Sequence, residues 1–152
     1  MKLFRIASRQ FPIFDGTGAR IHGARWNSPG RRVIYACGNL SCARIEILAH
    51  SGRHAPPTNH AFVEIDVPDE LRFETAEERS LPPGWDSVPD RHLARPIGDR
   101  WLASAASVVL RVPSVASPAD YNFLINQEHA NFSRIEASAA REIAWDERLF
   151  RQ

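Results

Sequence analysis

Short apolar runs that stop at proline limit the folds that this chain can adopt. In residues 61–67, apolar and polar side chains alternate up to Pro68, which is the pattern of a half-buried strand. A second run, 108–112, is rich in β-branched residues and is followed by Pro113. The strands are not joined by helices at the regular spacing that builds a parallel sheet. The sequence therefore indicates an α+β domain with short strands and few helices.

The rest of the chain reads as shorter elements and long connections. Residues 1–32 are rich in glycine and are expected to form loops and brief strands. The segment 68–98, with five prolines and many charges, is expected to be a long and mostly irregular connection. A short helix capped by Asp99 is expected over 101–107. Further strands are expected over 33–36, 121–125 and roughly 141–145.

The clearest helical pattern covers about 40–50. Its apolar side chains recur at a spacing of three and four residues, so that they share one face of a helix. Asn39 or Ser41 can accept hydrogen bonds from the first free backbone N–H groups. Gly52 is expected to end this helix.

Size and composition predict one soluble domain spanning 1–152. The 152 residues are 43% apolar and 24% charged, which is enough for one core. Nineteen basic and eighteen acidic residues give a formal charge of +1, so direct nucleic-acid binding is not favoured. There is no signal-peptide pattern and no apolar run of about 18 residues, so we expect a cytoplasmic protein away from membranes. Cys37 and Cys42 are expected to be reduced, buried thiols.

The densest group of polar side chains with possible chemistry lies in 22–30, followed by two isolated candidates. Arg25 next to Trp26 is either part of a site or a surface cation over an aromatic ring. Tyr35 lies in an apolar run and is either a core aromatic or part of a site. Glu46 is flanked by isoleucines and points either to solvent or into a cleft; its position near the apolar side of the helix favours the cleft.

Several common kinds of site are not supported by the sequence. The chain has no G-x-S-x-G elbow, no Walker lysine motif and no G-x-G-x-x-G fingerprint. Glu46 and His50 are four residues apart but have no companion ligand nearby, so we expect no metal site. The histidines form no compact metal-binding pattern: His22, His50, His54, His60, His92 and His129.

Three segments, 23–50, 99–126 and 145–150, give the chain a resemblance to the RES-domain toxins of bacterial toxin–antitoxin modules. The first contains Arg-Trp-Asn-x-x-Gly, a tyrosine ten residues after the arginine and a glutamate eleven after the tyrosine. The second contains a Pro-Ser pair. The resemblance implies functional roles for Arg25, Tyr35, Glu46 and Ser114, with Ser107 as a second candidate serine.

The chain departs from this resemblance in one turn. Many members of the family have Asn-Pro-x-His where this sequence has Asn-Gln-Glu-His at 126–129. The departure makes a role for this turn doubtful but affects none of the main positions.

The resemblance implies an ADP-ribosyltransferase-like fold. It also implies that the protein uses NAD as a substrate and has no true cofactor. Glu46 would stabilise the oxocarbenium-like ribose that forms when the nicotinamide bond breaks. Arg25 would bind the diphosphate, and Tyr35 would lie against the nicotinamide ring. Both are therefore expected to take part in catalysis with Glu46. The expected NAD-binding set is Arg25, Trp26, Ser28, Tyr35, Ser107 and Ser114.

The resemblance also implies a protein partner and leaves the reaction open. The partner would be an Xre-type antitoxin with a helix-turn-helix and a segment that blocks the NAD cleft. The chain would either degrade NAD, by hydrolysis or phosphorolysis, or transfer ADP-ribose to a protein. A rival interpretation is a non-catalytic binding module in which Arg25 and Glu46 form a structural ion pair.

Overall fold

Eight strands form one mixed sheet in the computed structural model, which describes residues 1–51 and 55–151. The order of the main path is β4-β5-β6-β2-β1-β3-β7, and β8 pairs with β3. β4 and β5 run parallel, whereas the other paired strands are antiparallel. The strands are β1 (Lys2–Ser8), β2 (Val33–Cys37), β3 (His60–Asp66), β4 (Phe73–Thr75), β5 (Val109–Pro113), β6 (Tyr121–Asn126), β7 (Glu136–Ala137) and β8 (Arg141–Glu142).

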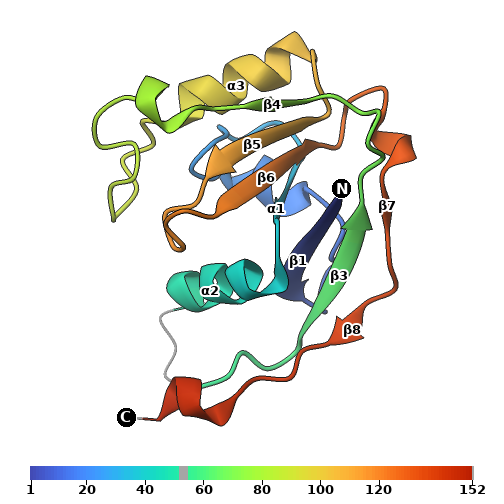
Figure 1. Cartoon of the computed structure of the whole chain (residues 1–152), viewed down its shortest axis with the longest axis vertical. Helices are drawn as coiled ribbons and strands as arrows, with labels where there is room; N and C mark the ends of the chain where they lie inside the picture. Colours follow the sequence, from blue (N-terminus) through green and yellow to red (C-terminus); the bar gives the residue numbers. More distant parts are fainter. Residues whose placement is uncertain (52–54, 152) are drawn as a thin grey trace.

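Two of the helices pack on one face of this sheet. α2 (Leu40–Ser51) packs against β1 and β2 (Figure 1). α3 (Arg95–Ser104) contributes Trp101 and Leu102 to one apolar cluster with residues of β5 and β6. A short α1 (Thr17–His22) packs against β2. Three 3₁₀ turns complete the secondary structure: Glu78–Ser80, Phe132–Arg134 and Glu147–Phe150. Among the residues that the structure describes, no helix is both long and apolar enough to cross a membrane.

The register of β2 against β6 decides which side chains lie on the helix-covered face. Tyr35 is opposite Leu124, and Cys37 is opposite Asn122. Because directly paired residues point to the same side of a sheet, Tyr35, Cys37 and Asn122 share one face. Leu124 packs there with the apolar side of α3. The opposite face carries the larger apolar core.

The main elements expected from the sequence are confirmed. β2, β3, β5 and β6 fall within about one residue of their expected limits, and the fold is α+β with a mixed sheet and few helices. α2 occupies the expected range, and Asn39 Oδ1 accepts a hydrogen bond of 2.7 Å from the Cys42 amide, as a helix cap does. Gly52, expected to end this helix, lies outside the described residues.

The expected helix capped by Asp99 was wrong in its start and its end. α3 begins at Arg95, with Pro96 in its first turn, and ends at Ser104 before Ala105 adopts a left-handed conformation. Asp99 therefore lies inside the helix. Its carboxylate accepts from the Ser28 amide at 2.9 Å and the Ser28 hydroxyl at 2.6 Å, so a tertiary contact takes the place of the expected cap.

Other differences are confined to short elements. α1 forms within the segment expected to contain only loops and strands, and β4 adds three strand residues to the irregular connection. The strand expected over roughly 141–145 is limited to the two residues of β8, and β7 was not predicted. Strands of two or three residues carry too little periodicity to be recognised.

Candidate active site

A cavity of about 550 Å³ opens between α2, the turn at 24–26 and two loops of the chain. The side of β2 that carries Tyr35 and the start of β6 contribute its floor. Val88 and Asp90 line it from the Pro-rich connection, so this connection forms one wall of the cavity. The polar and aromatic residues lining it are Phe4, Arg5, Arg25, Trp26, Tyr35, Cys37, Glu46, His50, Asp90 and Asn122.

Glu46 of α2 lines this cavity, with its side chain 18% exposed. Its Oε1 accepts two hydrogen bonds, one of 2.7 Å from Ser114 Oγ and one of 2.6 Å from Asn122 Nδ2. His50 Nδ1 lies 3.8 Å from the other oxygen, Oε2. The carboxylate is therefore fixed through one oxygen, while within 1–51 and 55–151 this long contact is the only one of Oε2. The expectation that Glu46 points into a cleft is matched by this placement.

Arg25 lies at the wall formed by the Pro-rich connection. Its Nη1 donates to the Trp85 carbonyl at 2.7 Å and to Asp90 Oδ1 at 3.3 Å, and its Nη2 donates to the Ser87 carbonyl at 3.1 Å. The side chain is 19% exposed. Arg25 thus holds the 85–90 segment in place and is neither a surface cation nor the ion-pair partner of Glu46.

Asp90 is a second carboxylate in the cavity. It accepts from the His92 amide at 2.8 Å and lies 3.0 Å from His92 Nδ1. Although burial opposes ionisation, the hydrogen bonds with His92 and the charge of Arg25 lower the pKa of Asp90 below its usual value. Asp90 is therefore an anion at neutral pH and pairs with Arg25.

Tyr35 lies on the cavity floor with its hydroxyl turned toward the turn at 24–28. The hydroxyl donates to Asn27 Oδ1 at 2.7 Å, and burial raises the pKa of Tyr35 well above its usual range. Asn27 is fully buried, and its amide nitrogen donates to the Ala19 and Ser28 carbonyls. Arg5 Nη1 donates to the Tyr35 carbonyl at 2.7 Å. Tyr35 is thus a protonated phenol with a fixed ring.

The turn that carries Arg25 is clamped by α3. Arg95 Nε donates to the Ala24 carbonyl at 2.9 Å, and Asp99 binds Ser28 as described above. Gly98 lies so close that an added Cβ would fall 1.7 Å from the Trp26 carbonyl oxygen. Only glycine leaves room for this approach.

Two further residues of the expected NAD-binding set lie in this turn. Trp26 is 2% exposed and lines the cavity, and its ring packs at 5.6 Å and 44° against Trp85. Ser28 is bound to Asp99 and, among the described residues, does not belong to those lining the cavity. The turn therefore brings Arg25 and Trp26 to the cavity, while Ser28 holds the turn to α3.

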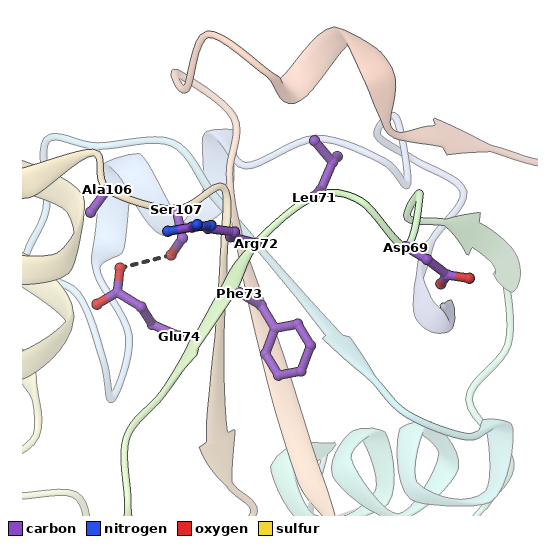
Figure 2. A pocket seen from close by; sticks show the side chains of 7 residues that line it. All are labelled: Asp69, Leu71, Arg72, Phe73, Glu74, Ala106 and Ser107. Atoms are coloured by element: carbon purple, nitrogen blue, oxygen red, sulfur yellow. Dashed lines mark hydrogen bonds between the residues drawn. The ribbon is translucent and has the colours of Figure 1, made fainter.

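The two candidate serines lie in different places. Ser114, at the end of β5, is 5% exposed and binds Glu46. Ser107 donates to Glu74 Oε1 at 2.9 Å (Figure 2), and it accepts from Trp101 Nε1 at 2.9 Å. It lines a separate pocket of about 520 Å³ beside β4. The structure thus brings Ser114, and not Ser107, to Glu46.

The cysteines and histidines have other surroundings. Cys37 and Cys42 are free and buried, as expected. Across residues 1–51 and 55–151, no three His, Cys, Asp or Glu side chains are grouped so that they could hold a metal ion. His54 lies outside the described residues.

Three residues of the site were missed by reading the sequence: Asn27, Asp90 and Asn122. Asn27 directly follows the Arg-Trp pair, so its position was a usable signal. Asp90 and Asn122 lie 65 and 76 positions from Arg25 and Glu46, the residues they contact. Nothing local marks these two residues, because folding alone brings them to the cavity. Together the site offers a fixed carboxylate, a guanidinium and aromatic surfaces in one cavity, an arrangement suited to a ligand with a sugar, a phosphate and a flat ring.

The sequence of this chain is similar to that of known proteins. The family model described as "RES domain" matches residues 2–146. The protein "Prs ADP-ribosylating toxin" of a Sphingobium species is 37% identical, covering 91% of this chain and 87% of that protein. "Toxin Res" of Yersinia enterocolitica is 31% identical over 98% of this chain and 99% of its own length. "Toxin Res" of Pseudomonas putida is 32% identical over 99% of this chain.

A solved structure has a similar fold. The crystal structure of the M. tuberculosis MbcT–MbcA toxin–antitoxin complex contains a chain that superposes with a TM-score of 0.75 at 15% identity. The match covers 98% of this chain and 86% of that chain. The arrangement of sheet and helices is therefore shared over nearly the whole length.

Proposed function

Because this chain belongs to the RES domain family, and is thus the toxin of a toxin–antitoxin module, we propose that it breaks the nicotinamide–ribose bond of NAD. The observation that carries the proposal is the placement of Glu46. Its Oε1 is fixed by Ser114 and Asn122 on one wall of a 550 Å³ cavity, while Arg25 and Asp90 lie on the wall formed by the Pro-rich connection. NAD joins a ribose, a diphosphate and flat rings, the groups that such walls can bind.

In the proposed reaction, the bond between ribose C1′ and the nicotinamide nitrogen breaks, and its electron pair leaves with nicotinamide. The ribose becomes oxocarbenium-like in the transition state. The Glu46 carboxylate stabilises this positive charge and accepts a hydrogen bond from a ribose hydroxyl through Oε2. Water or phosphate then adds to C1′ and loses a proton, which completes NAD degradation.

Binding falls to the other lining residues. Tyr35 on the cavity floor is the candidate for the nicotinamide ring; Trp26 also lines the cavity but, at 2% exposed, offers little surface. Arg25 is the candidate for the diphosphate, because a guanidinium forms paired hydrogen bonds with phosphate oxygens. Since Arg25 already pairs with Asp90 and two carbonyls of the 85–90 segment, diphosphate binding has to compete with the Asp90 contact.

The test is the isosteric variant Glu46→Gln. Wild-type protein mixed with NAD should release nicotinamide, measured by chromatography. The variant should bind NAD with similar affinity in calorimetry but lose about 100-fold or more in turnover, because the lost charge acts mainly in the transition state. Wild-type turnover in the variant would reject the role of Glu46. Absence of NAD consumption by the wild type, with or without a protein acceptor, would reject the function.

A second candidate reaction is ADP-ribosylation of a protein. It is favoured by one observation, the 37% identity to a protein named "Prs ADP-ribosylating toxin". The same cleavage would occur, but a protein side chain would attack C1′ in place of water. Expression in bacteria without antitoxin separates the two: arrest with falling NAD supports degradation, whereas arrest at normal NAD with a protein mass shift of one ADP-ribose supports transfer. Glu46→Gln should be tolerated in both cases.

The proposed partner is an Xre-type antitoxin with a helix-turn-helix. A solved structure of similar fold is a toxin–antitoxin complex, which supports a protein partner for this chain. The rival interpretation as a non-catalytic module required an ion pair between Arg25 and Glu46. The structure instead pairs Arg25 with Asp90, and Glu46 lines the cavity with its Oε1 bound to Ser114.

A further inference from the structure

Asn122 of β6 joins three elements at the floor of the cavity. Its Nδ2 donates to Glu46 Oε1 on α2 at 2.6 Å, and its Oδ1 accepts from Cys37 Sγ on β2 at 3.2 Å. Both ends of the amide are thus bound to protein groups. Because its polar atoms face Glu46 and Cys37, Asn122 is best suited to hold the Glu46 side chain in place.

The orientation of this amide is fixed by its neighbours. Were the amide reversed, its oxygen would face the Glu46 carboxylate and its nitrogen would face the Cys37 thiol. Hydrogen bonding with Cys42, together with burial, raises the pKa of Cys37 far above its usual value, so the thiol keeps its proton. The Glu46 carboxylate can only accept hydrogen bonds, so the amide nitrogen of Asn122 has to face it, which leaves a single amide orientation.

We propose that Asn122 is a positioning residue that fixes Glu46 Oε1 and thereby directs Oε2 toward the ribose of the substrate. This inference rests on the proposed function and adds a residue to it. Ser114, directly after β5, is the second donor, and its oxygen accepts the Ser117 amide at 3.0 Å. Asn122 lies within a strand paired on both sides, with β2 and with β5.

Two donors on one oxygen restrain the carboxylate more than one does. With Ser114 as its only donor, the Glu46 carboxylate could rotate about that contact. A small displacement of a reacting group lowers the rate by about 100-fold. Substrate contacts elsewhere in the cavity would remain, so the loss should fall on kcat while KM stays nearly unchanged.

The experiment compares Asn122→Ala, Asn122→Asp and wild type in the NAD consumption assay. Asn122→Ala should lower kcat about 10- to 100-fold with KM within a factor of about three. Asn122→Asp keeps the shape of the side chain but replaces the donor with an acceptor. Its kcat at pH 8 should fall at least as far, and its ratio to wild-type kcat should rise as the pH falls, because a protonated carboxyl can donate again.

The matched control is Asn126→Ala at the other end of the same strand. Asn126 is 1% exposed, and its Oδ1 accepts from the Glu128 amide. Loss of a buried asparagine from β6 should lower the melting temperature in both alanine variants, but kcat only in Asn122→Ala. Equal kcat loss in both would reduce Asn122 to a structural residue and overturn the proposal.

Glu46→Gln, assayed in parallel, separates the two levels of failure. If the wild type consumes NAD and Glu46→Gln does not, but both Asn122 variants keep wild-type kcat, the positioning role is rejected and the proposed function stands. If the wild type itself leaves NAD unchanged in every assay, the proposed function is rejected. In that case a crystal structure of Asn122→Ala still tests positioning: an unmoved Glu46 carboxylate would overturn it.

Discussion

Ser114 Oγ donates a hydrogen bond of 2.7 Å to Glu46 Oε1, although 68 positions separate the two residues. Because the serine precedes a turn closed by the Ser117 amide on its own oxygen, its side chain is held at the end of β5. Through this contact Ser114 supports the Glu46 carboxylate. A direct contact between Ser114 and NAD stays a prediction.

The first prediction compares the two candidate serines. Ser114→Ala should lower kcat about 10-fold or more, since Glu46 loses one of its two donors. Ser107→Ala should leave kcat near wild type but lower the free energy of unfolding by about 1–3 kcal/mol, because it removes the partner of buried Trp101 Nε1. Steady-state kinetics and urea denaturation measure the two effects. A kcat loss in Ser107→Ala alone would reverse the assignment.

The sequence was sufficient for the elements with strong patterns and for residues that share a local segment. Alternation in β3 and helical spacing in α2 were readable because each element buries one face. Arg25, Tyr35 and Glu46 were identified through the spacing of a family motif. Asn122 and Asp90 were not, because their contacts depend on strand order and on the path of the 85–90 segment. Asp99 was misread because an aspartate suits both a helix cap and a contact with a distant residue, and the sequence does not tell the two apart.

The second prediction concerns the pair of Arg25 and Asp90. Asp90→Asn removes the charge that competes for the guanidinium, so NAD affinity in calorimetry should rise several-fold. Arg25→Lys should lower it, because an ammonium cannot form two parallel bonds to a diphosphate. The sign of the pH effect follows from the lowered pKa of Asp90, which keeps the carboxylate ionised at neutral pH. The difference between wild type and Asp90→Asn should therefore stay constant from pH 6 to 8.

An unchanged affinity in both variants would contradict this prediction. It would show that Arg25 acts only as a clamp on the 85–90 segment, to which it donates through both terminal nitrogens. A loss of affinity in Asp90→Asn would instead show that the Asp90 contact arranges the site. The melting temperature of each variant controls for loss of the segment.

The third prediction tests the close approach of α3 to the turn at 24–28. Gly98→Ala would place a methyl group 1.7 Å from the Trp26 carbonyl oxygen, so the helix or the turn has to move. We expect a loss of about 3 kcal/mol or more in the free energy of unfolding and a lower NAD affinity. Gly18→Ala in α1, where nothing lies within 4 Å of an added Cβ, is the matched control. It should be neutral or slightly stabilising.

The last prediction concerns the antitoxin. An enzyme that consumes NAD has to be restrained while the cell grows, and we propose that the restraint acts at Arg25. The contact with Asp90 at 3.3 Å shows that a carboxylate fits this guanidinium. An acidic side chain or chain terminus of the antitoxin could therefore replace Asp90 there and occupy the place of the diphosphate. Val88, 82% exposed on the 85–90 segment, would widen the contact.

If substrate and antitoxin share Arg25, they compete for it. Saturating NAD should weaken the complex with the antitoxin, measured as a rise in Kd. Arg25→Ala should weaken NAD binding and antitoxin binding together, whereas Arg134→Ala, at an exposed ion pair with Glu70, should change neither. A Kd that is insensitive both to NAD and to Arg25→Ala would place inhibition outside this cavity. The Arg25→Ala variant tests the binding of both ligands to the same guanidinium. If it lost affinity for NAD but not for the antitoxin, the antitoxin would have to bind elsewhere than the substrate site.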